Sequence, residues 1–273
     1  MLEFAYMQRA LLAGALLSIA IPLIGVVMVN RKTAMIGDAL SHTSLAGVGL
    51  GLILGMNPVG GAVLICIVSA FAIEFFRKRF PQYGDLATAV IMSSGLGIAA
   101  ILSDLAPGGN SFEAYLFGSI SSVSEKDLIF VGICFVLVIW ASLHYYAALL
   151  DLAIDKNLAR LAGVPVRYIN AIFTCLTALT IGISIKIVGG LMVTSLMVLP
   201  VAAALMISRS YKTTVITSVC LGFVYMLVGL TSSYYMDVKP GGTIVMTSVI
   251  GLLITTVLSR VRKAPKETIA KTH

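Results

Sequence analysis

One acidic and one imidazole side chain lie inside an otherwise apolar stretch of the sequence. Asp38 and His42 are four residues apart in the segment Gly37–Leu45, so a helix places both on one face. If this helix crosses a membrane, His42 lies about 15 Å along its axis from Lys32, near the middle of a hydrocarbon core about 30 Å thick. Ionisable groups at that depth are costly and indicate a functional site.

A carboxylate and an imidazole at this spacing can form half of a site for a divalent transition metal. Two ligands bind a metal poorly, but two copies of the chain facing each other would supply two Asp and two His, a full tetrahedral set. A purely structural alternative is that Asp38 and His42 bond to each other and tie helices together. A membrane enzyme using Ser41 and His42 is a third alternative, although no oxyanion motif supports it.

The composition indicates that lipid surrounds most of the chain. Hydrophobic residues make up 59% of the 273 residues and charged residues 11%, less than half the charge of an average soluble domain. This excludes a cytosolic enzyme, a secreted disulfide scaffold and a disordered chain. The sequence leaves room for a single transmembrane permease-type domain over residues 1–273, with no separate nucleotide-binding or nucleic-acid-binding domain.

Long apolar runs predict an all-α, polytopic membrane protein, because lipid offers no partner for open backbone. Since Val188-Gly189-Gly190 could join two of the runs into one broken helix, eight spans is an alternative to nine. The nine runs are about 7–29, 34–55, 58–76, 86–104, 127–148, 168–187, 189–208, 213–235 and 241–259.

The distribution of basic residues predicts the orientation. If Arg31 and Lys32 are cytoplasmic and the runs alternate, all Lys and Arg residues fall on the cytoplasmic side except Arg9, Lys126, Lys186 and Lys239. This follows the positive-inside rule and places the N-terminus outside and the C-terminus in the cytoplasm. The basic tail at 260–273 is then an anionic-lipid contact or a stop signal.

Missing motifs narrow the chemistry. The sequence has no GxxxxGK[ST], so this chain is not expected to hydrolyse ATP itself, and no HExxH or GxSxG supports a membrane hydrolase. The four cysteines lie in apolar runs without CxxC spacing, which favours buried thiols over a disulfide or a thiolate metal site.

Two further features are candidates for function. Residues 151–167 form a cytoplasmic connection in which Asp155 can cap a short helix with apolar positions Leu158, Leu161 and Ala162. Gly163 and Pro165 end that helix, which either lies on lipid or docks on a cytoplasmic partner. Three hydroxyl residues could line a pathway: Ser41, and Thr194 and Ser195 in the seventh run. Thr194 and Ser195 could instead bond the backbone freed by Pro200.

Several motifs in order make the chain similar to a known family. The segment Gly37–Leu50, with Asp38 and His42, resembles the signature of the metal-ion ABC permeases, the ABC-3 family of zinc and manganese importers. The likeness continues through Phe112–Gly118, Asp155–Val166 and Val188–Pro200, and covers nearly the whole chain up to about residue 259.

This resemblance implies a type II ABC importer-like permease in the bacterial plasma membrane. It implies a homodimer bound to two cytoplasmic ATPase subunits and served by an extracytoplasmic solute-binding protein. It implies that Asp38 and His42 bind the transported metal, that no cofactor is held permanently, and that ATP is hydrolysed in the partner. The coupling segment it implies contains Asp155, Leu158, Ala159, Leu161 and Gly163.

The cargo and the energy source have alternatives. The runs Phe112–Gly118 and Leu176–Pro200 look more like zinc-type permeases, so Zn²⁺ is the expected cargo, although an Asp and His set also suits Mn²⁺ or Fe²⁺. An iron chelate would need a wide apolar cavity and would not need Asp38. An ion-gradient secondary transporter would use Asp38 as a proton acceptor, but no convincing internal repeat supports it.

Overall fold

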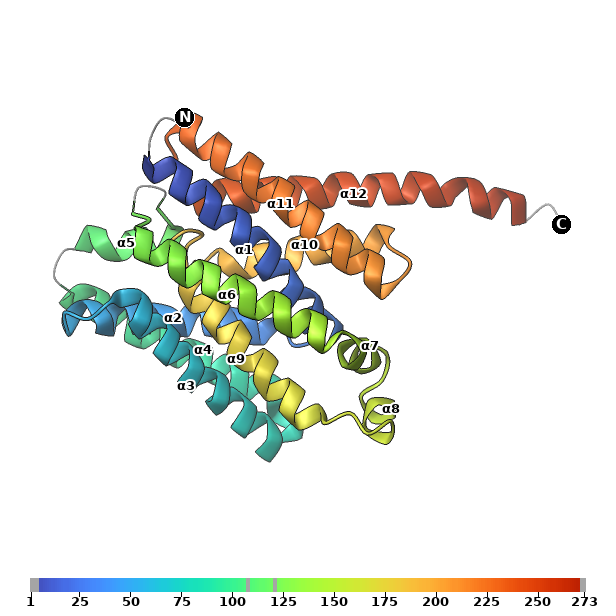
Figure 1. Ribbon diagram of the computed structural model, residues 1–273, viewed down its shortest axis with the longest axis horizontal. Coiled ribbons are helices and arrows are strands. Elements are labelled where there is room, and N and C mark those ends of the chain that lie inside the picture. Colours follow the sequence, from blue (N-terminus) through green and yellow to red (C-terminus); the bar gives the residue numbers. More distant parts are fainter. Residues whose placement is uncertain (1–4, 107–108, 120–121, 271–273) are drawn as a thin grey trace.

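The computed structural model describes residues 5–106, 109–119 and 122–270, and this part of the chain is helical almost throughout, with no strand (Figure 1). Each of the nine apolar runs corresponds to one long helix, which confirms the all-α membrane fold. These helices are α1 (Ala5–Asn30), α2 (Ala34–Ile53), α3 (Pro58–Arg79), α4 (Gly84–Leu105), α6 (Glu125–His144), α9 (Val166–Ser184), α10 (Val193–Ile207), α11 (Tyr211–Met236) and α12 (Pro240–Ala270).

Seven of these helices are long and apolar enough to cross a membrane by length and composition alone. The other two are α10, with only 15 residues, and α2, whose 20 residues include the polar run around Asp38 and His42. Both pack among the seven in the same bundle. The expectation of eight to nine crossings is therefore approximate, and α2 depends on its neighbours more than on its own hydropathy.

Short elements gather at the two ends of the bundle. The α5 end contains α5 (Gly109–Phe117) and the turns before α3 and α12. The basic end contains η1 (Pro81–Tyr83), α7 (Tyr146–Ile154) and α8 (Lys156–Leu161), together with Arg31, Lys32 and Arg77. Successive long helices run in opposite directions, and α12 extends past the bundle on the basic side (Figure 1). Residues 271–273 of the basic tail lie outside the described residues.

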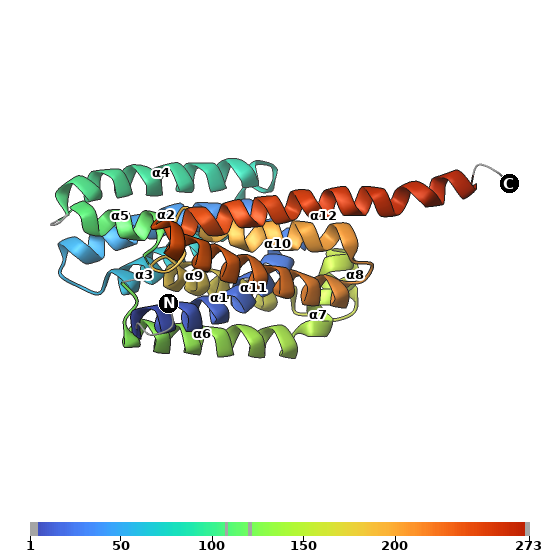
Figure 2. The same cartoon turned by 90° about the horizontal axis from the view of Figure 1, so that it is seen from above.

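The centre of the bundle is α1. Its apolar side chains are buried on several faces, including Leu17, Ile21 and Ile24, and it packs against α6, α9, α10 and α11. Figure 2 shows α4 and α12 along one edge of the molecule and α6 along the opposite edge. These outer helices expose many large apolar side chains, such as Ile101, Trp140 and Leu253, as expected for surfaces that face lipid or another subunit.

The connection between α9 and α10 is a separate structural element, residues 185–192. Its backbone bonds to α5: Gly190 N–H donates to the Tyr115 carbonyl at 2.8 Å, and Leu191 N–H to the Leu116 carbonyl at 3.2 Å. Gly189 adopts a φ of 92°, in the left-handed region that favours glycine. The sixth and seventh runs are thus two helices joined by a turn at the α5 end.

Glycines allow α2 to lie unusually close to α3. A Cβ atom on Gly47 would collide with the carbonyl oxygen of Gly61, and one on Gly61 would collide with the carbonyl oxygen of Gly47. Gly51 is equally tight, with its Cβ position 2.8 Å from the Cα of Pro58. Between membrane helices, where burial from lipid supplies little driving force, such close backbone contact is a principal source of association.

We therefore expect Gly47→Val to destabilise the protein by at least about 2 kcal/mol, because the new side chain must push α2 away from α3. Thermal unfolding of the purified protein in detergent measures this effect. The matched control is Gly97→Val, since Gly97 is exposed on α4 and has nothing within 4 Å of its Cβ position. Equal melting temperatures for the two variants would contradict the proposed packing.

Candidate functional site

The site begins one turn into α2. The chain leaves α1 through Lys32, a non-glycine residue with a φ of 54°, and the Thr33 hydroxyl donates to the Met28 carbonyl at 3.2 Å. This tight turn fixes the start of α2. Asp38 and His42 then lie on one face, as their spacing predicts, with His42 Nε2 3.8 Å from Asp38 Oδ1.

Two hydroxyl groups connect this face of α2 to the elements that follow α9. Thr194 of α10 donates from its Oγ1 to Asp38 Oδ1 at 3.2 Å. The Ser41 hydroxyl donates to the carbonyl oxygen of Gly190. Ser195 is half-buried, and the structure records no contact between it and Asp38 or His42. Of the three hydroxyl residues suggested by the sequence, Ser41 and Thr194 are therefore the ones that hold α2.

The acid and the imidazole are neither fully buried nor free in solvent. The side chain of Asp38 is 40% exposed and that of His42 is 20% exposed. His42 Nδ1 is buried and has no hydrogen-bond partner. A carboxylate that opens from the middle of a membrane helix is expected to face a water-filled path or another subunit rather than lipid. The pair therefore lies at an open face of this single chain.

The geometry suits two ligands of one metal ion. Two ligand atoms about 2.1 Å from a tetrahedral Zn²⁺ lie about 3.4 Å apart, a few tenths of an ångström less than the 3.8 Å found here. Within the described residues, no group of three or more His, Cys, Asp or Glu side chains could hold a metal. One chain thus offers two ligands and leaves the remaining coordination positions open.

The enzyme alternative lacks its first requirement. A serine nucleophile must bond to its general base, but the Ser41 hydroxyl is directed to Gly190 and not to His42. All four cysteines are free thiols. Cys66 and Cys134 are buried, and their thiols lie against Leu40 O and Thr180 Oγ1. Cys175 is half-buried and Cys220 is exposed, so the prediction of four buried thiols is wrong for Cys220.

The segment 151–167 forms the short helices α7 and α8 at the basic end. Asp155 caps α8 as the sequence predicts, accepting from Asn157 N–H at 2.6 Å and from Leu158 N–H at 3.3 Å. Gly163 ends it with a φ of 81°. Ala159 is buried, whereas Leu158 and Leu161 are 60% and 85% exposed. Leu158 and Leu161 therefore point away from the bundle, whereas Ala159 packs against it.

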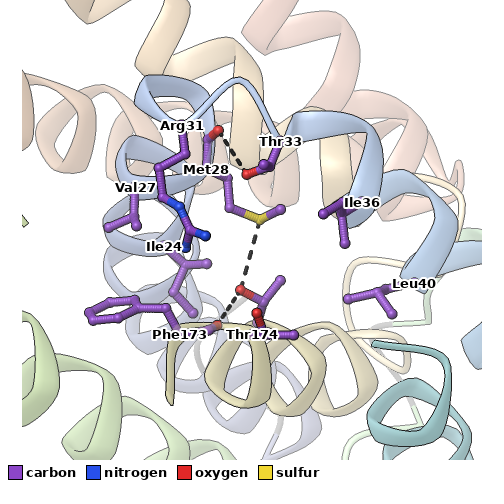
Figure 3. Close-up of a pocket in the computed structure, with 10 residues that line it drawn as sticks. Ile24, Val27, Met28, Arg31, Thr33, Ile36, Leu40, Phe173 and Thr174 are labelled. Atoms are coloured by element: carbon purple, nitrogen blue, oxygen red, sulfur yellow. Dashed lines mark hydrogen bonds between the residues drawn. The ribbon is translucent and has the colours of Figure 1, made fainter. Parts of the chain in front are cut away.

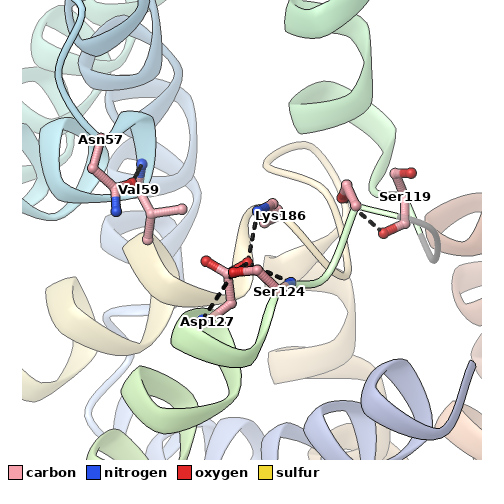
Figure 4. Close-up of polar contacts among 7 residues, drawn as sticks. Asn57, Val59, Ser119, Ser124, Asp127 and Lys186 are labelled. Carbon is pink, nitrogen blue, oxygen red and sulfur yellow. Dashed lines mark hydrogen bonds and ion pairs between the residues drawn. The ribbon is translucent and has the colours of Figure 1, made fainter. Parts of the chain in front are cut away.

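Ion pairs at the α5 end were not visible in the sequence, where the acids there were expected to be solvated. Lys186 of the 185–192 connection binds Asp127 of α6 at 2.6 Å, and Asp127 also accepts from Ser124 N–H at 2.8 Å (Figure 4). Lys239 forms an ion pair with Glu113 of α5. The partners in these pairs are 59 and 126 residues apart in the chain, too far for spacing rules to connect them.

A bundle of antiparallel membrane helices around a half-exposed acid and imidazole pair is the architecture expected of a membrane permease. The chain belongs to the ABC-3 transport family, whose model matches residues 3–259. It is 35% identical to a probable metal transport system membrane protein of Treponema pallidum over 97% of this chain and 99% of that protein. It is therefore a permease subunit of a metal-ion ABC transporter.

Relatives of this chain transport different metals. It is 31% identical to the high-affinity zinc uptake membrane protein ZnuB of Haemophilus influenzae, over 90% of this chain and 94% of ZnuB. It is 29% identical to the manganese import permease ScaB of Streptococcus gordonii, over 92% and 91%. The solved structure of PsaBC from Streptococcus pneumoniae in complex with Fab matches with a TM-score of 0.84 and 26% identity, over 92% and 91%.

If Asp38 and His42 bind the transported metal, removing either ligand should abolish transport without unfolding the helix. We expect Asp38→Asn or His42→Ala to reduce metal uptake by about 100-fold or more, since even outer-shell changes cost 10–100-fold. Uptake of radioactive zinc into cells containing the complete transporter measures this.

Matched controls exist for both ligands. Asp104→Asn changes an exposed acid at the end of α4, and His144→Ala removes an imidazole that stacks on Trp140. Both should retain uptake. Wild-type uptake in Asp38→Asn or His42→Ala, with equal amounts of protein in the membrane, would exclude the pair as a metal site.

Proposed function

We propose that this permease imports Zn²⁺ into the cytoplasm by alternating access, as the membrane subunit of an ATP-binding-cassette importer. The observation that carries this proposal is the open pair of Asp38 and His42, 3.8 Å apart in the middle of α2. A transported ion must bind briefly and leave, and an exposed two-ligand half-site suits transient binding better than a closed tetrahedral cage.

A second copy of the chain completes the coordination in this proposal. Two chains related by a two-fold axis bring two Asp38 and two His42 side chains together, four ligands for one cation. The partial exposure of both side chains supports this arrangement, because a paired chain would cover the face that is open here. The cation then lies at the seam between subunits.

The direction of transport follows from charge. The basic end, with Arg31, Lys32 and Arg77, faces the cytoplasm under the positive-inside rule, so the N-terminus is outside. The α5 end receives the cation from an extracytoplasmic binding protein. Passage of the ion requires α2 and α10 to separate, which breaks the contacts Thr194–Asp38 and Ser41–Gly190.

The energy comes from ATPase subunits that dock on α8. Leu158 and Leu161 are exposed at the basic end, and no other residue in the described part of this chain buries them. Apolar side chains that project from a capped helix are suited to a hydrophobic socket on a partner. Movement of α8 passes directly into α9 through Gly163 and Pro165.

The choice of Zn²⁺ over Mn²⁺ or Fe²⁺ rests on ligand chemistry and on similarity. Imidazole suits zinc well, whereas manganese prefers oxygen ligands, and the motifs Phe112–Gly118 and Leu176–Pro200 are most like those of zinc-type permeases. A manganese or iron permease of the same family is the alternative, and an ion-gradient transporter is a more distant one.

We expect Zn²⁺, delivered with the cognate binding protein, to stimulate ATP hydrolysis by the reconstituted complex more strongly than Mn²⁺ or Fe²⁺. The measurement is phosphate release across a concentration series of each metal. Stronger stimulation by Mn²⁺ would replace the proposed cargo without changing the family. Metal uptake by the permease alone, with no nucleotide, would instead establish the gradient-driven alternative.

The docking of the ATPase is tested on α8. Leu161→Glu should weaken co-purification of the ATPase subunit by at least about tenfold, because an apolar contact is replaced by a desolvated charge. Leu54→Glu is the matched control, since Leu54 is 66% exposed at the opposite end. Retained association in Leu161→Glu would exclude α8 as the docking helix.

Gly163 tests the turn that joins α8 to α9. A Cβ atom there meets nothing within 4 Å, so Gly163→Val acts through its left-handed φ and not through a clash. The expected result is an altered path from α8 into α9, with either ATP hydrolysis that no longer drives transport or loss of ATPase binding. Normal coupled transport would show that this turn does not carry the movement.

A further inference from the structure

A crevice of about 640 Å³ opens at the basic end, beside the start of α8. Its walls come from the ends of α1 and α3, from the α7–α8 junction and from the first turns of α9. The charged residues that line it are Arg31, Lys32, Glu74, Arg77, Lys78 and Asp155. A crevice of this size is in the range of small-molecule sites.

The two acids of the crevice are already engaged. Glu74 binds Lys78 one helical turn away at 2.9 Å, and Asp155 caps α8. Within the described residues, Arg31, Lys32 and Arg77 form no ion pair. The crevice therefore carries four basic residues against two acids, which leaves an excess of two positive charges.

Arg31 is directed into the protein rather than toward solvent. Figure 3 shows its side chain folding back from the end of α1, past Val27, toward Ile24 and Phe173. It lines both the crevice and a smaller cavity that continues between α1, α2 and α9. Burial is the main cause that lowers the pKa of the guanidinium, and Arg77 adds to it while Glu74 opposes it. Arginine nevertheless keeps its charge, so this half-buried cation favours binding of an anion.

A second group in the same crevice also lacks a partner. The side-chain carbonyl oxygen of Asn170 is buried and accepts no hydrogen bond. It needs a donor, such as a hydroxyl group. The crevice thus presents an excess of cations for an anion, and Asn170 on its α9 wall has a side-chain oxygen that still needs a donor.

Neither the cation route nor topology accounts for this arrangement, and the ATPase proposed to dock on α8 would contact Leu158 and Leu161, which do not line the crevice. A route for a metal cation does not benefit from unpaired guanidinium groups. The positive-inside rule requires basic residues in loops, where exposed ones such as Arg167 and Arg209 suffice, and it gives no reason for Arg31 to turn inward.

We propose that this crevice binds a phosphate group of an ester that also bears a hydroxyl, carried by an anionic phospholipid headgroup or by a soluble phosphate ester. Arg31 and Arg77 hold the phosphate oxygens, because guanidinium groups match phosphate geometry, and Asn170 accepts from the hydroxyl. Basic pockets between helices on the cytoplasmic side suit such headgroups. Since Leu152–Asp155 forms one wall, the bound phosphate also steadies the start of α8.

The test uses the full-length permease, stripped of lipid in detergent. Phosphatidylglycerol, phosphatidylcholine and glycerol phosphate are added separately, and binding is measured by native mass spectrometry and by the shift in melting temperature. Phosphatidylglycerol should bind and raise the melting temperature, while zwitterionic phosphatidylcholine should not. The same effect from glycerol phosphate would identify a soluble ester as a sufficient ligand.

The variants locate the site. Arg31→Gln and Arg77→Gln should each weaken binding by about tenfold or more, through loss of charge-assisted hydrogen bonds. Arg209→Gln removes the same charge at the basic end, outside the crevice, and should bind as the wild type does. If Arg31→Gln does not fold, Arg77→Gln decides the question.

Two results would overturn the proposal. One is the absence of binding by both phosphatidylglycerol and glycerol phosphate in the wild type. The other is equal binding in Arg31→Gln, Arg77→Gln and Arg209→Gln, which would indicate non-specific attraction to the basic end. Either result leaves the metal site on α2 untouched, because this test does not involve Asp38, His42 or metal.

Discussion

The close backbone contact between α2 and α3 is the constraint on which the rest of this structure depends. α2 carries Asp38 and His42, the proposed metal ligands, and it is not among the seven helices that are long and apolar enough to cross a membrane by composition alone. Gly47 and Gly61 allow the two backbones to meet directly, and packing at that distance replaces the missing hydropathy. Asp38 and His42 can then lie at an open face of the bundle while α2 remains packed against α3. The proposed site on α2 is thus supported by Gly47 and Gly61, whose lack of a side chain lets α2 pack directly on α3.

The same face of α2 is connected to the α5 end through backbone and hydroxyl groups. Ser41 bonds to Gly190, and the next residue of that connection, Leu191, bonds to α5. Lys186, in the same segment, is fixed by Asp127. The 185–192 connection therefore touches the site, α5 and α6 at once. A change in any of these elements alters the environment of Asp38, which gives the segment a role in holding the site as well as in joining two helices.

The sequence predicted the helices well because their signal is local. Each span is a run of apolar residues, and the cap of α8 by Asp155 needs only three residues. The site pair was also local, since Asp38 and His42 share one turn. The partners of that pair were not: Thr194 is 156 residues from Asp38 and lies on another helix. The buried ion pair of Asp127 with Lys186 and the inward turn of Arg31 likewise depend on how distant helices pack, which no spacing rule reports.

Coupling across the membrane has a simple covalent route in this fold. α9 starts three residues after Gly163 and has 19 residues, or about 28 Å of helix. At its other end it enters the 185–192 connection, whose Gly190 accepts from Ser41. In the proposed mechanism, a displacement of α8 along this axis reaches α2 through α9, which packs directly against α2, and through the hydrogen bond between Ser41 and Gly190. The Ser41–Gly190 hydrogen bond is weaker than the helix α9 itself, so movement of α9 breaks this hydrogen bond first. In the proposed mechanism, α9, which would receive the movement of α8, and α2, which carries the proposed metal ligands, then separate near Asp38.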